Sequence, residues 1–305
     1  MAFKLLTDEA LAQIGTVSHE RTGLVTADGI AKFCSGILEE SPEHFDAAAA
    51  RALGFPDIVA PPTFAYATTR PAPPRSAYLP DGQYGFVAPP GLQHLQTMLG
   101  GQAWELHRPA IVGEVLEEHR TVLSMDEREG KTGPMVIVRS EQAFRTPGGE
   151  PVETLVSTLI LRAPPPAVEG AAPAEHALPA SSGALPVAGP NQMVVQTDMI
   201  QAFLFNASIW AVHRIHWDVP YARSEGLPSV VLVGWNMANF VARLGRKLAP
   251  EGKRLYTLDL SYRAIGHPGD VLTISAHETG ADGLTQVTVT NTRGTTNVIG
   301  TMGWA

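Results

Sequence analysis

Hydrophobic and polar residues alternate in two separate groups of segments, and a period of two predicts β-strands buried on one face. The first group lies between Gln102 and Arg162, in the runs QAWELHRPAIV, EVLEEHRTVLSM, PMVIVRSEQAF and VETLVSTLILR. The second lies between Leu255 and Ala305, in the runs LYTLDLSYRAI, DVLTISAHETG, LTQVTVTNTR and TNVIGTMGWA. Turn residues separate the runs, so each group predicts an antiparallel sheet.

Apolar residues at helical spacing precede each group of strands. Helices followed by a sheet, twice over, predict an α+β fold in which the helices pack on the sheet. In the first half, the predicted helices are residues 28–37, a short helix through Ala50 and Arg51, and a longer helix over 92–100. In the second half, they are residues 197–209, a short helix through Ala222 and Arg223, and a longer helix over 235–248.

The two halves repeat one another. HFDAAAARALGFPDIVAPPTF, from His44, aligns with HWDVPYARSEGLPSVVLVGWN, from His216, at a constant offset of 172 residues. Later in the halves, GEVL at Gly113 aligns with GDVL at Gly269 at an offset of 156. The first half therefore carries about sixteen additional residues, and the proline-rich segment 70–85, called the insert below, is the candidate for them.

A segment rich in Pro, Ala, Gly and Ser divides the two halves and has no apolar periodicity. This composition is typical of an interdomain linker. We therefore expect a first domain over residues 1–162, a linker over 163–191 and a second domain over 192–305.

Composition narrows the classes of partner. The formal net charge is −8, and no cluster of Lys and Arg overrides it, which disfavours nucleic acid and anionic membranes. The one cysteine, Cys34, is expected to be a small buried residue rather than a catalytic thiol. Asp8 and Glu9 stand where a signal peptide needs an apolar core, and no apolar run approaches ~18 residues. We expect a cytoplasmic protein without a membrane span.

The sequence IHWDVPYAR, from Ile215, resembles the motif of the MaoC-like, (R)-specific enoyl-thioester hydratase/dehydratase family in its fused, double hot-dog form. SPEHFDAAAARALGFPDIVAPPTF, from Ser41, is similar to the non-catalytic, substrate-holding partner of heterodimeric dehydratases. The resemblance implies two tandem hot-dog domains, each an antiparallel sheet wrapped around a long helix, which pair as a pseudo-dimer within one chain. It also implies a substrate carried as a thioester of coenzyme A or acyl carrier protein, and no metal or redox cofactor. Whether two chains form a further homodimer stays open.

Hydration of an α,β-unsaturated thioester needs a base, an acid and a donor for the charge on the thioester oxygen. In the family, an Asp and a His five residues later hold the water, and a glycine N–H eighteen residues past the His is the donor. The second half has His216 and Gly234, but Ala211 stands at the acid position. The first half has Glu39 and His44, but Pro62, which has no N–H, stands at the donor position.

We expect the active site in the second half, because His213, three residues before His216, is a candidate for the missing acid. The predicted catalytic residues are His216, His213 and Gly234, and Glu39 with His44 form the alternative catalytic pair. The residues expected to bind substrate are Arg214, Asp218, Trp210 and Trp235. Five basic residues either bind the phosphates of coenzyme A or form a solvated helix face: Arg214, Arg223, Arg243, Arg246 and Lys247. Asp218 is also expected to cap the helix that follows it. Two histidines without a carboxylate partner are a poor zinc site.

Three functions remain open on these residues. The leading one is reversible hydration of a 2-enoyl to an (R)-3-hydroxyacyl thioester at a site that lacks the usual Asp. A site with one base and an oxyanion donor also suits an isomerase or cyclase that moves a single proton. Defects in both halves are compatible with a non-catalytic, substrate-holding subunit.

Overall fold

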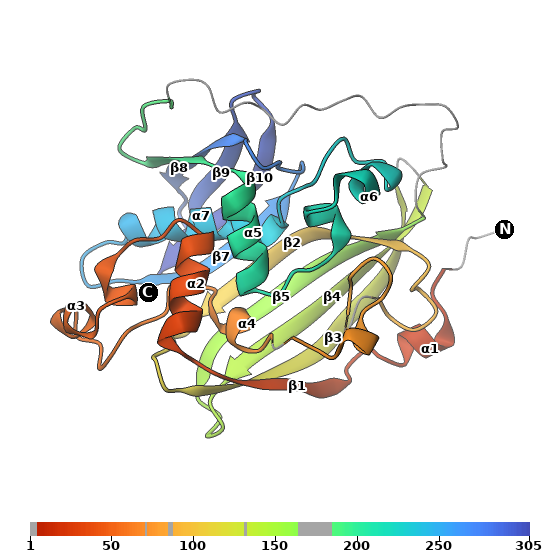
Figure 1. Cartoon of the computed structure of the whole chain (residues 1–305), viewed down its shortest axis with the longest axis horizontal. Helices are drawn as coiled ribbons and strands as arrows, with labels where there is room; N and C mark the ends of the chain where they lie inside the picture. The colour runs from red at the N-terminus through yellow and green to blue at the C-terminus, as the bar shows by residue number, and fades with distance from the viewer. Residues whose placement is uncertain (1–4, 71, 85–87, 131–132, 164–184) are drawn as a thin grey trace.

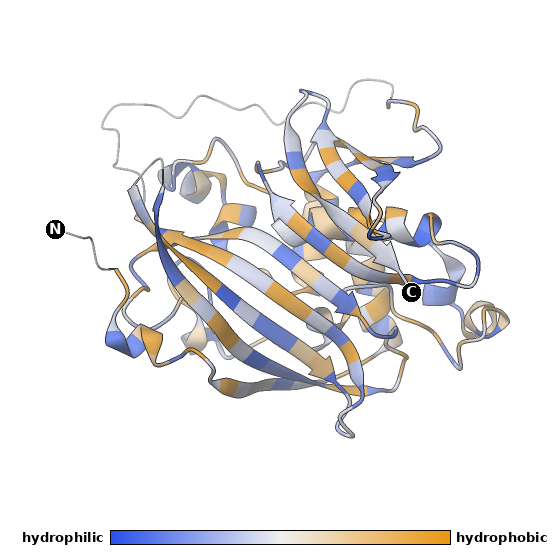
Figure 2. Cartoon of the chain, turned by 180° about the vertical axis from the view of Figure 1, so that it is seen from behind, coloured by the Kyte–Doolittle hydropathy of each residue, from blue (hydrophilic) through white to orange (hydrophobic). Residues whose placement is uncertain are grey.

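The computed structural model describes residues 5–70, 72–84, 88–130, 133–163 and 185–305 (Figure 1). Its strands form one ten-stranded sheet in the order β1-β3-β4-β5-β2-β7-β10-β9-β8-β6, and every pairing between these strands is antiparallel. Helices lie against one side of this sheet, and the view from behind shows its other face, where hydrophilic and hydrophobic residues alternate along the strands (Figure 2). The predicted α+β class and the antiparallel sheets are confirmed.

In the first half, the helices and turns are α1 (Asp8–Leu11), α2 (Ala27–Gly36), η1 (Pro42–His44), α3 (Ala47–Ala52), α4 (Ala65–Thr68) and η2 (Arg75–Ala77). The strands are β1 (Val17–Leu24), β2 (Gln96–Leu106), β3 (Val115–Gly130), β4 (Gly133–Arg145) and β5 (Pro151–Arg162). In the second half, the helices and turns are α5 (Met199–Ser208), η3 (Arg214–His216), α6 (Val219–Ser224) and α7 (Gly234–Lys247). The strands are β6 (Gln192–Gln196), β7 (Leu255–Tyr262), β8 (Val271–Thr279), β9 (Thr285–Asn291) and β10 (Thr296–Trp304).

The internal repeat predicted from the sequence is confirmed. Helix α5, the turn η3 and helix α6 each begin 172 positions after α2, η1 and α3 and have the same lengths. The eight predicted strand segments overlap β2 to β5 and β7 to β10. The sequence patterns missed β1 and β6, which open the two halves and form the two edges of the sheet.

A strand pairing and a helix contact are among the contacts that join the halves. In the middle of the sheet β2 pairs with β7, with Trp104 opposite Leu258, so that both halves share one sheet. On the helical side α2 packs against α5 (Figure 1). Gly36 lies so close there that a Cβ atom would stand 2.5 Å from the Cα of Phe205. The close approach of the two helices therefore requires a glycine at position 36.

Among the described residues, a long helix lies on the sheet in the second half and not in the first. Helix α7 is buried along most of its length, and it contacts β6, β7, β8, β9 and β10. Its buried residues, which include Phe240 and Leu244, belong to the main hydrophobic core. This is the helix predicted over 235–248.

The long helix predicted over 92–100 is wrong. Residues from Gln96 onward belong to β2, where Thr97 pairs with Leu161 of β5. The counterpart of α7 in the first half is the single turn α4, and Pro73 and Pro74 follow it closely. A proline lacks the N–H that a helix needs and clashes with the preceding turn. In its described residues the first half is therefore an antiparallel sheet without a long helix, and the insert follows α4.

The predicted linker over 163–191 falls largely on residues 164–184, which lie outside the described residues. No helix in the described part of the chain is long and apolar enough to cross a membrane. Cys34 is buried in the core, as expected.

Candidate active site

His216 ends the short turn η3, and the chain fifteen residues later holds its ring. The His216 Nδ1 lies 2.8 Å from the carbonyl oxygen of Val231, and the Val231 N–H donates to the carbonyl of Ile215 at 3.1 Å. Because a carbonyl only accepts, Nδ1 carries the hydrogen and Nε2 keeps its lone pair. The imidazole therefore presents a basic nitrogen away from its anchor.

Burial holds His216 in its neutral form. Removal of the ring from water lowers its pKa to about 4, the bond to Val231 opposes this, and the charge of His213 lowers the pKa further. At neutral pH the side chain is therefore an uncharged proton acceptor.

Gly234 is the first residue of α7, three residues after Val231. The first N–H groups of a helix have no acceptor within the helix, and the helix dipole makes that end attractive to negative charge. A Cβ atom at position 234 would lie 3.1 Å from Leu99 Cδ2 and 3.4 Å from Tyr262 Cε1. A glycine leaves this helix end open, as an oxyanion donor requires.

His213 lies next to His216 and meets the insert of the first half. The two imidazole centroids are 6.0 Å apart, with the rings nearly perpendicular. His213 Nε2 is 3.3 Å from the side-chain nitrogen of Gln83 and 3.8 Å from Asp81 Oδ2. Burial holds the pKa of His213 below its usual value, and the charges of Asp81 and Glu225 oppose this only in part. An acid thus reaches the second-half motif from another part of the chain.

The insert is firmly packed against this motif. The Arg214 N–H donates to the Asp81 carbonyl at 2.8 Å, and the Trp210 indole N–H donates to the Tyr78 hydroxyl at 2.6 Å. Gly82 has a φ of +90°, and a Cβ there would stand 2.3 Å from the Val212 carbonyl oxygen. No sequence pattern points to Asp81, because it lies 132 positions before His213 and only folding brings the two side chains together.

The predicted substrate-binding residues separate into different environments. Arg214 donates to the Asp218 carboxylate at 2.7 and 2.9 Å, and Asp218 caps α6 through the Tyr221 N–H at 3.1 Å. Trp210 contacts the insert as described above. Trp235 is buried in the core, with its ring centroid 4.2 Å from that of Tyr66. The capping role of Asp218 is confirmed, and the substrate roles of these residues stay predictions.

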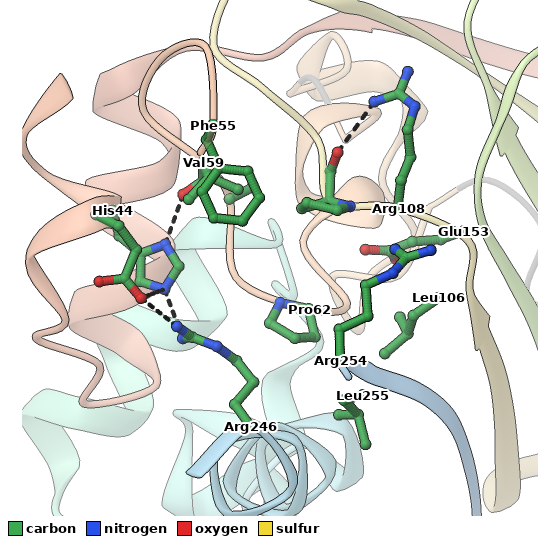
Figure 3. Close-up of a pocket in the computed structure, with 13 residues that line it drawn as sticks. His44, Phe55, Val59, Pro62, Leu106, Arg108, Glu153, Arg246, Arg254 and Leu255 are labelled. Carbon is green, nitrogen blue, oxygen red and sulfur yellow. Dashed lines mark hydrogen bonds and ion pairs between the residues drawn. The ribbon is translucent and has the colours of Figure 1, made fainter. Parts of the chain in front are cut away.

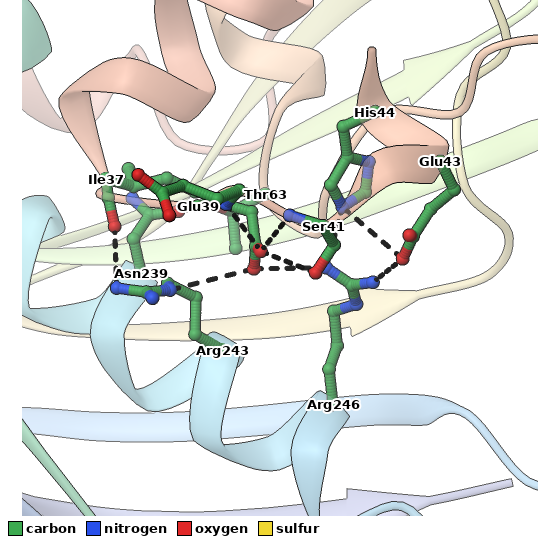
Figure 4. A network of polar contacts seen from close by, with 10 residues as sticks. Ile37, Glu39, Ser41, Glu43, His44, Thr63, Asn239, Arg243 and Arg246 are labelled. Carbon is green, nitrogen blue, oxygen red and sulfur yellow. Dashed lines mark hydrogen bonds and ion pairs between the residues drawn. The ribbon is translucent and has the colours of Figure 1, made fainter. Parts of the chain in front are cut away.

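The alternative pair, Glu39 and His44, is brought together by an arginine from the other half (Figure 4). His44 Nδ1 lies 2.6 Å from the Val59 carbonyl, so the ring is anchored as in His216. Arg246 of α7 donates to His44 Nε2 at 2.7 Å and to Glu39 Oε2 at 3.2 Å. Arg246 also donates to Glu43, and the Arg243 Nε is 3.6 Å from Glu39 Oε2. The free nitrogen of His44 and the carboxylate are therefore both occupied.

The ionisation of this pair follows from its surroundings. Burial raises the pKa of Glu39, but hydrogen bonds from Ser41 and the charges of Arg246 and Arg243 outweigh it, so the net pKa is lowered. Burial lowers the pKa of His44, and Arg246 lowers it further. The carboxylate is charged and the imidazole is neutral. Arg243 and Arg246 hold this pair, and neither faces solvent as part of a hydrated helix surface.

A cavity of about 130 Å³ opens beside this first-half pair (Figure 3). Figure 3 shows His44 and Arg246 on one side of it, Glu153 and Arg254 on the other, and Pro62 between them. Phe55, Leu106 and Leu255 contribute apolar walls. Within the described ranges, no group of three or more His, Cys, Asp or Glu side chains could hold a metal ion.

Comparisons with known proteins identify similar chains. Residues 12–155 match the family model described as "FAS1-like, dehydratase domain region". A UPF0336 protein from Saccharopolyspora erythraea is 37% identical over 139 residues, which cover 45% of this chain and 81% of that protein. A mesaconyl-C(4)-CoA hydratase from Chloroflexus aurantiacus is 27% identical over 199 residues, or 62% of this chain and 65% of that enzyme.

The structure is similar to that of a MaoC-like dehydratase from Phytophthora capsici. The TM-score is 0.70 at 18% sequence identity, and the superposition covers 98% of each chain. This likeness spans both halves and confirms the double hot-dog fold.

Proposed function

The chain belongs to the UPF0336 family, and because its residues 12–155 match a FAS1-like dehydratase domain region and its fold is that of a MaoC-like dehydratase, we propose that it is an acyl-thioester hydratase/dehydratase. It interconverts a 2-enoyl and an (R)-3-hydroxyacyl thioester of coenzyme A or acyl carrier protein. The observation that carries the proposal is the pairing of a neutral His216, whose Nε2 is available, with Gly234 at the N-terminus of α7. Val231, which anchors the imidazole, lies three residues before that helix end.

The chemistry follows from these two groups. In hydration, His216 Nε2 takes a proton from water as the water oxygen bonds to the β-carbon. The electron pair of the double bond moves toward the thioester oxygen, where the Gly234 N–H stabilises the charge. The proton then passes to the α-carbon, so that one water is added. Dehydration is the reverse.

Asp81 and His213 take the place of the missing acid at position 211. The Asp81 carboxylate lies 3.8 Å from His213 Nε2, and the His213 ring lies edge-to-face with His216. Burial lowers the pKa of His213, and the Asp81 carboxylate opposes this by favouring the protonated form, in which His213 can give a proton beside His216. In this proposal the insert contributes to the chemistry of the second half.

Turnover of a panel of enoyl-CoA and enoyl-acyl-carrier-protein substrates by the purified chain tests the proposal. We expect His216→Asn to lower kcat by about 100-fold or more, the usual contribution of a proton-transfer group. The matched control is His277→Asn, because His277 is exposed on β8 and its Nε2 lies 2.8 Å from the Thr288 hydroxyl, away from the candidate site. Equal activity of the wild type and His216→Asn would refute the assignment.

Ala211 favours a second candidate function. Its side chain is partly buried against the main core, so the acid position carries no polar group of its own. A single base with an oxyanion donor can move a proton between substrate carbons without adding water. Deuterium from solvent at substrate carbons, without a hydrated product, would select this isomerase or cyclase. The variant Ala211→Asp should then lose activity, whereas a hydratase should retain or gain it.

Arg246 favours a substrate-holding role for the first half, because it occupies both members of the Glu39–His44 pair. Extended to the whole chain, this is the third candidate, a non-catalytic subunit. Robust turnover by the isolated chain would eliminate that candidate.

A further inference from the structure

The cavity beside Pro62 is separate from the turn that holds His216. It has a volume of about 130 Å³, and its walls include the side chains of Phe55, Leu106 and Leu255 (Figure 3). An apolar protein cavity of ~150 Å³ accommodates benzene, so this one has room for about six non-hydrogen atoms. The size fits a short hydrocarbon chain with a small polar head.

Glu153 supplies an unused polar group to this cavity. The residue is 4% exposed, and its Oε1 accepts from the Ala65 N–H at 3.5 Å. Its Oε2 is buried and has no hydrogen-bond partner among the described residues. Burial raises the pKa of Glu153 to about 8, against the opposing effect of the backbone N–H groups around Ala65. The carboxyl group is therefore neutral at pH 7, and its O–H is a donor without an acceptor. Such a group is costly unless a ligand or water bonds to it.

The arginine side chains that line the cavity differ in their ion pairs with carboxylates. Arg246 is balanced by Glu39 and Glu43, and Arg108 by Glu114 and Glu150. Arg254 donates to the carbonyl oxygen of His107, and no carboxylate of the described chain forms an ion pair with it. One positive charge at the cavity is thus left uncompensated.

We propose that this cavity binds a small monocarboxylate with a short hydrocarbon chain. The carboxylate accepts from Arg254 and from the Glu153 hydroxyl, and the hydrocarbon chain packs on Phe55, Leu106 and Leu255. A single negative charge balances the single free cation, while apolar walls disfavour the more strongly hydrated phosphate dianion. The site combines Phe55, Leu106 and Glu153 of the first half with Arg254 and Leu255 of the second. It does not depend on the reaction proposed for His216.

Titration calorimetry of the whole chain with butyrate tests this site, with butyramide and inorganic phosphate as comparison probes. We expect saturable binding of butyrate at pH 7, at least about tenfold tighter than binding of either comparison probe. A tenfold difference corresponds to ~1.4 kcal/mol, within the range of a charge-assisted hydrogen bond. No binding of butyrate, or equal binding of butyramide or phosphate, would overturn the proposal.

Two variants locate the bound carboxylate. Arg254→Gln should weaken butyrate at least about tenfold, whereas Arg128→Gln, which removes an exposed arginine at the far end of β3, should leave the affinity unchanged. An equal effect of both variants would mean that butyrate responds only to net charge, and would overturn the site.

The role of Glu153 is tested by pH. Butyrate affinity of the wild type should fall as the pH rises through about 8, because ionised Glu153 loses its donor and repels the ligand. Glu153→Gln retains an N–H donor of similar shape, so its butyrate affinity should stay constant over the same range. A wild-type affinity that is unchanged above pH 8, or a folded Glu153→Gln variant that binds no butyrate at any pH, would contradict this arrangement.

Discussion

His44 and His216 have the same anchor and different second partners. Each ring bonds through Nδ1 to a valine carbonyl fifteen residues later. In His44 the other nitrogen accepts from Arg246, whereas that of His216 is free to accept a proton. The sequence predicts both histidines through the repeat, but Arg246 lies 202 positions from His44. Only the packing of α7 between the halves decides which histidine is occupied.

At the same scale, Asp81 is predicted to control the protonation of His213. The Asp81 carboxylate raises the His213 pKa, so Asp81→Asn should lower it. A lower pKa leaves less of the protonated donor, and we expect kcat to fall about 10-fold to 100-fold with a small change in KM. Histidine titration by NMR together with the pH profile of kcat checks this. An unchanged His213 titration would show that the 3.8 Å contact has no electrostatic effect.

Glu153 should make the stability of the protein depend on pH. Its folded pKa of about 8 exceeds the reference value of 4.5, so the folded state holds a proton that the unfolded state has released between these values. The stabilising effect is complete below pH 4.5 and is lost as the pH rises through about 8. The slope is about 1.4 kcal/mol per pH unit for one proton. Denaturant unfolding of wild type and Glu153→Gln across this range should show a flatter curve for the variant, and parallel curves would contradict the raised pKa.

At the scale of elements, the repeat made most of the fold predictable. Once His44 was aligned with His216, the positions of α2, α3, α5 and α6 followed, and alternation gave eight of the ten strands. The failure over 92–100 has a physical cause: LQHLQTML has helical spacing, but the second part of it, from Gln96, pairs with β5, and this pairing decides its conformation. In the candidate site, Gly234 and the two histidines could be found from spacing. Asp81 could not, because no local pattern reports a tertiary contact.

The contact of α2 with α5 depends on the absence of a side chain at Gly36. A Cβ there would stand 2.5 Å and 2.7 Å from backbone atoms of Phe205, which cannot move aside as a flexible side chain does. Gly36→Ala should therefore lower the free energy of unfolding by about 1–3 kcal/mol, the usual cost of overpacking. Ser35→Ala on the exposed side of α2 is the control and should have little effect. An equally small effect of both variants in denaturant unfolding would mean that the helices separate easily.

At the scale of the whole molecule, the two halves share more than a sheet. Arg246 and Arg243 extend from α7 of the second half to Glu39 of the first, where the carboxylate is almost fully buried. Together with the β2–β7 pairing and the α2–α5 contact, these ion pairs tie the pseudo-dimer together. The halves are therefore expected to unfold as one unit.

Arg246→Gln tests this coupling. The change leaves Glu39 and Glu43 without their main cation, and removal of one partner of a buried ion pair costs about 3–5 kcal/mol. Arg246 also lowers the His44 pKa, so the variant should raise it, which histidine NMR detects. The double variant Arg246→Gln/Glu39→Gln removes the unpaired charge at position 39 and should recover part of the lost stability. The coupling energy is the effect of the double variant minus the summed effects of the two single variants. A coupling energy near zero, a single unfolding transition and an unchanged His44 titration would together show that the sheet and the helix contact alone hold the halves. A large coupling energy would place Arg246 among the groups that join the halves.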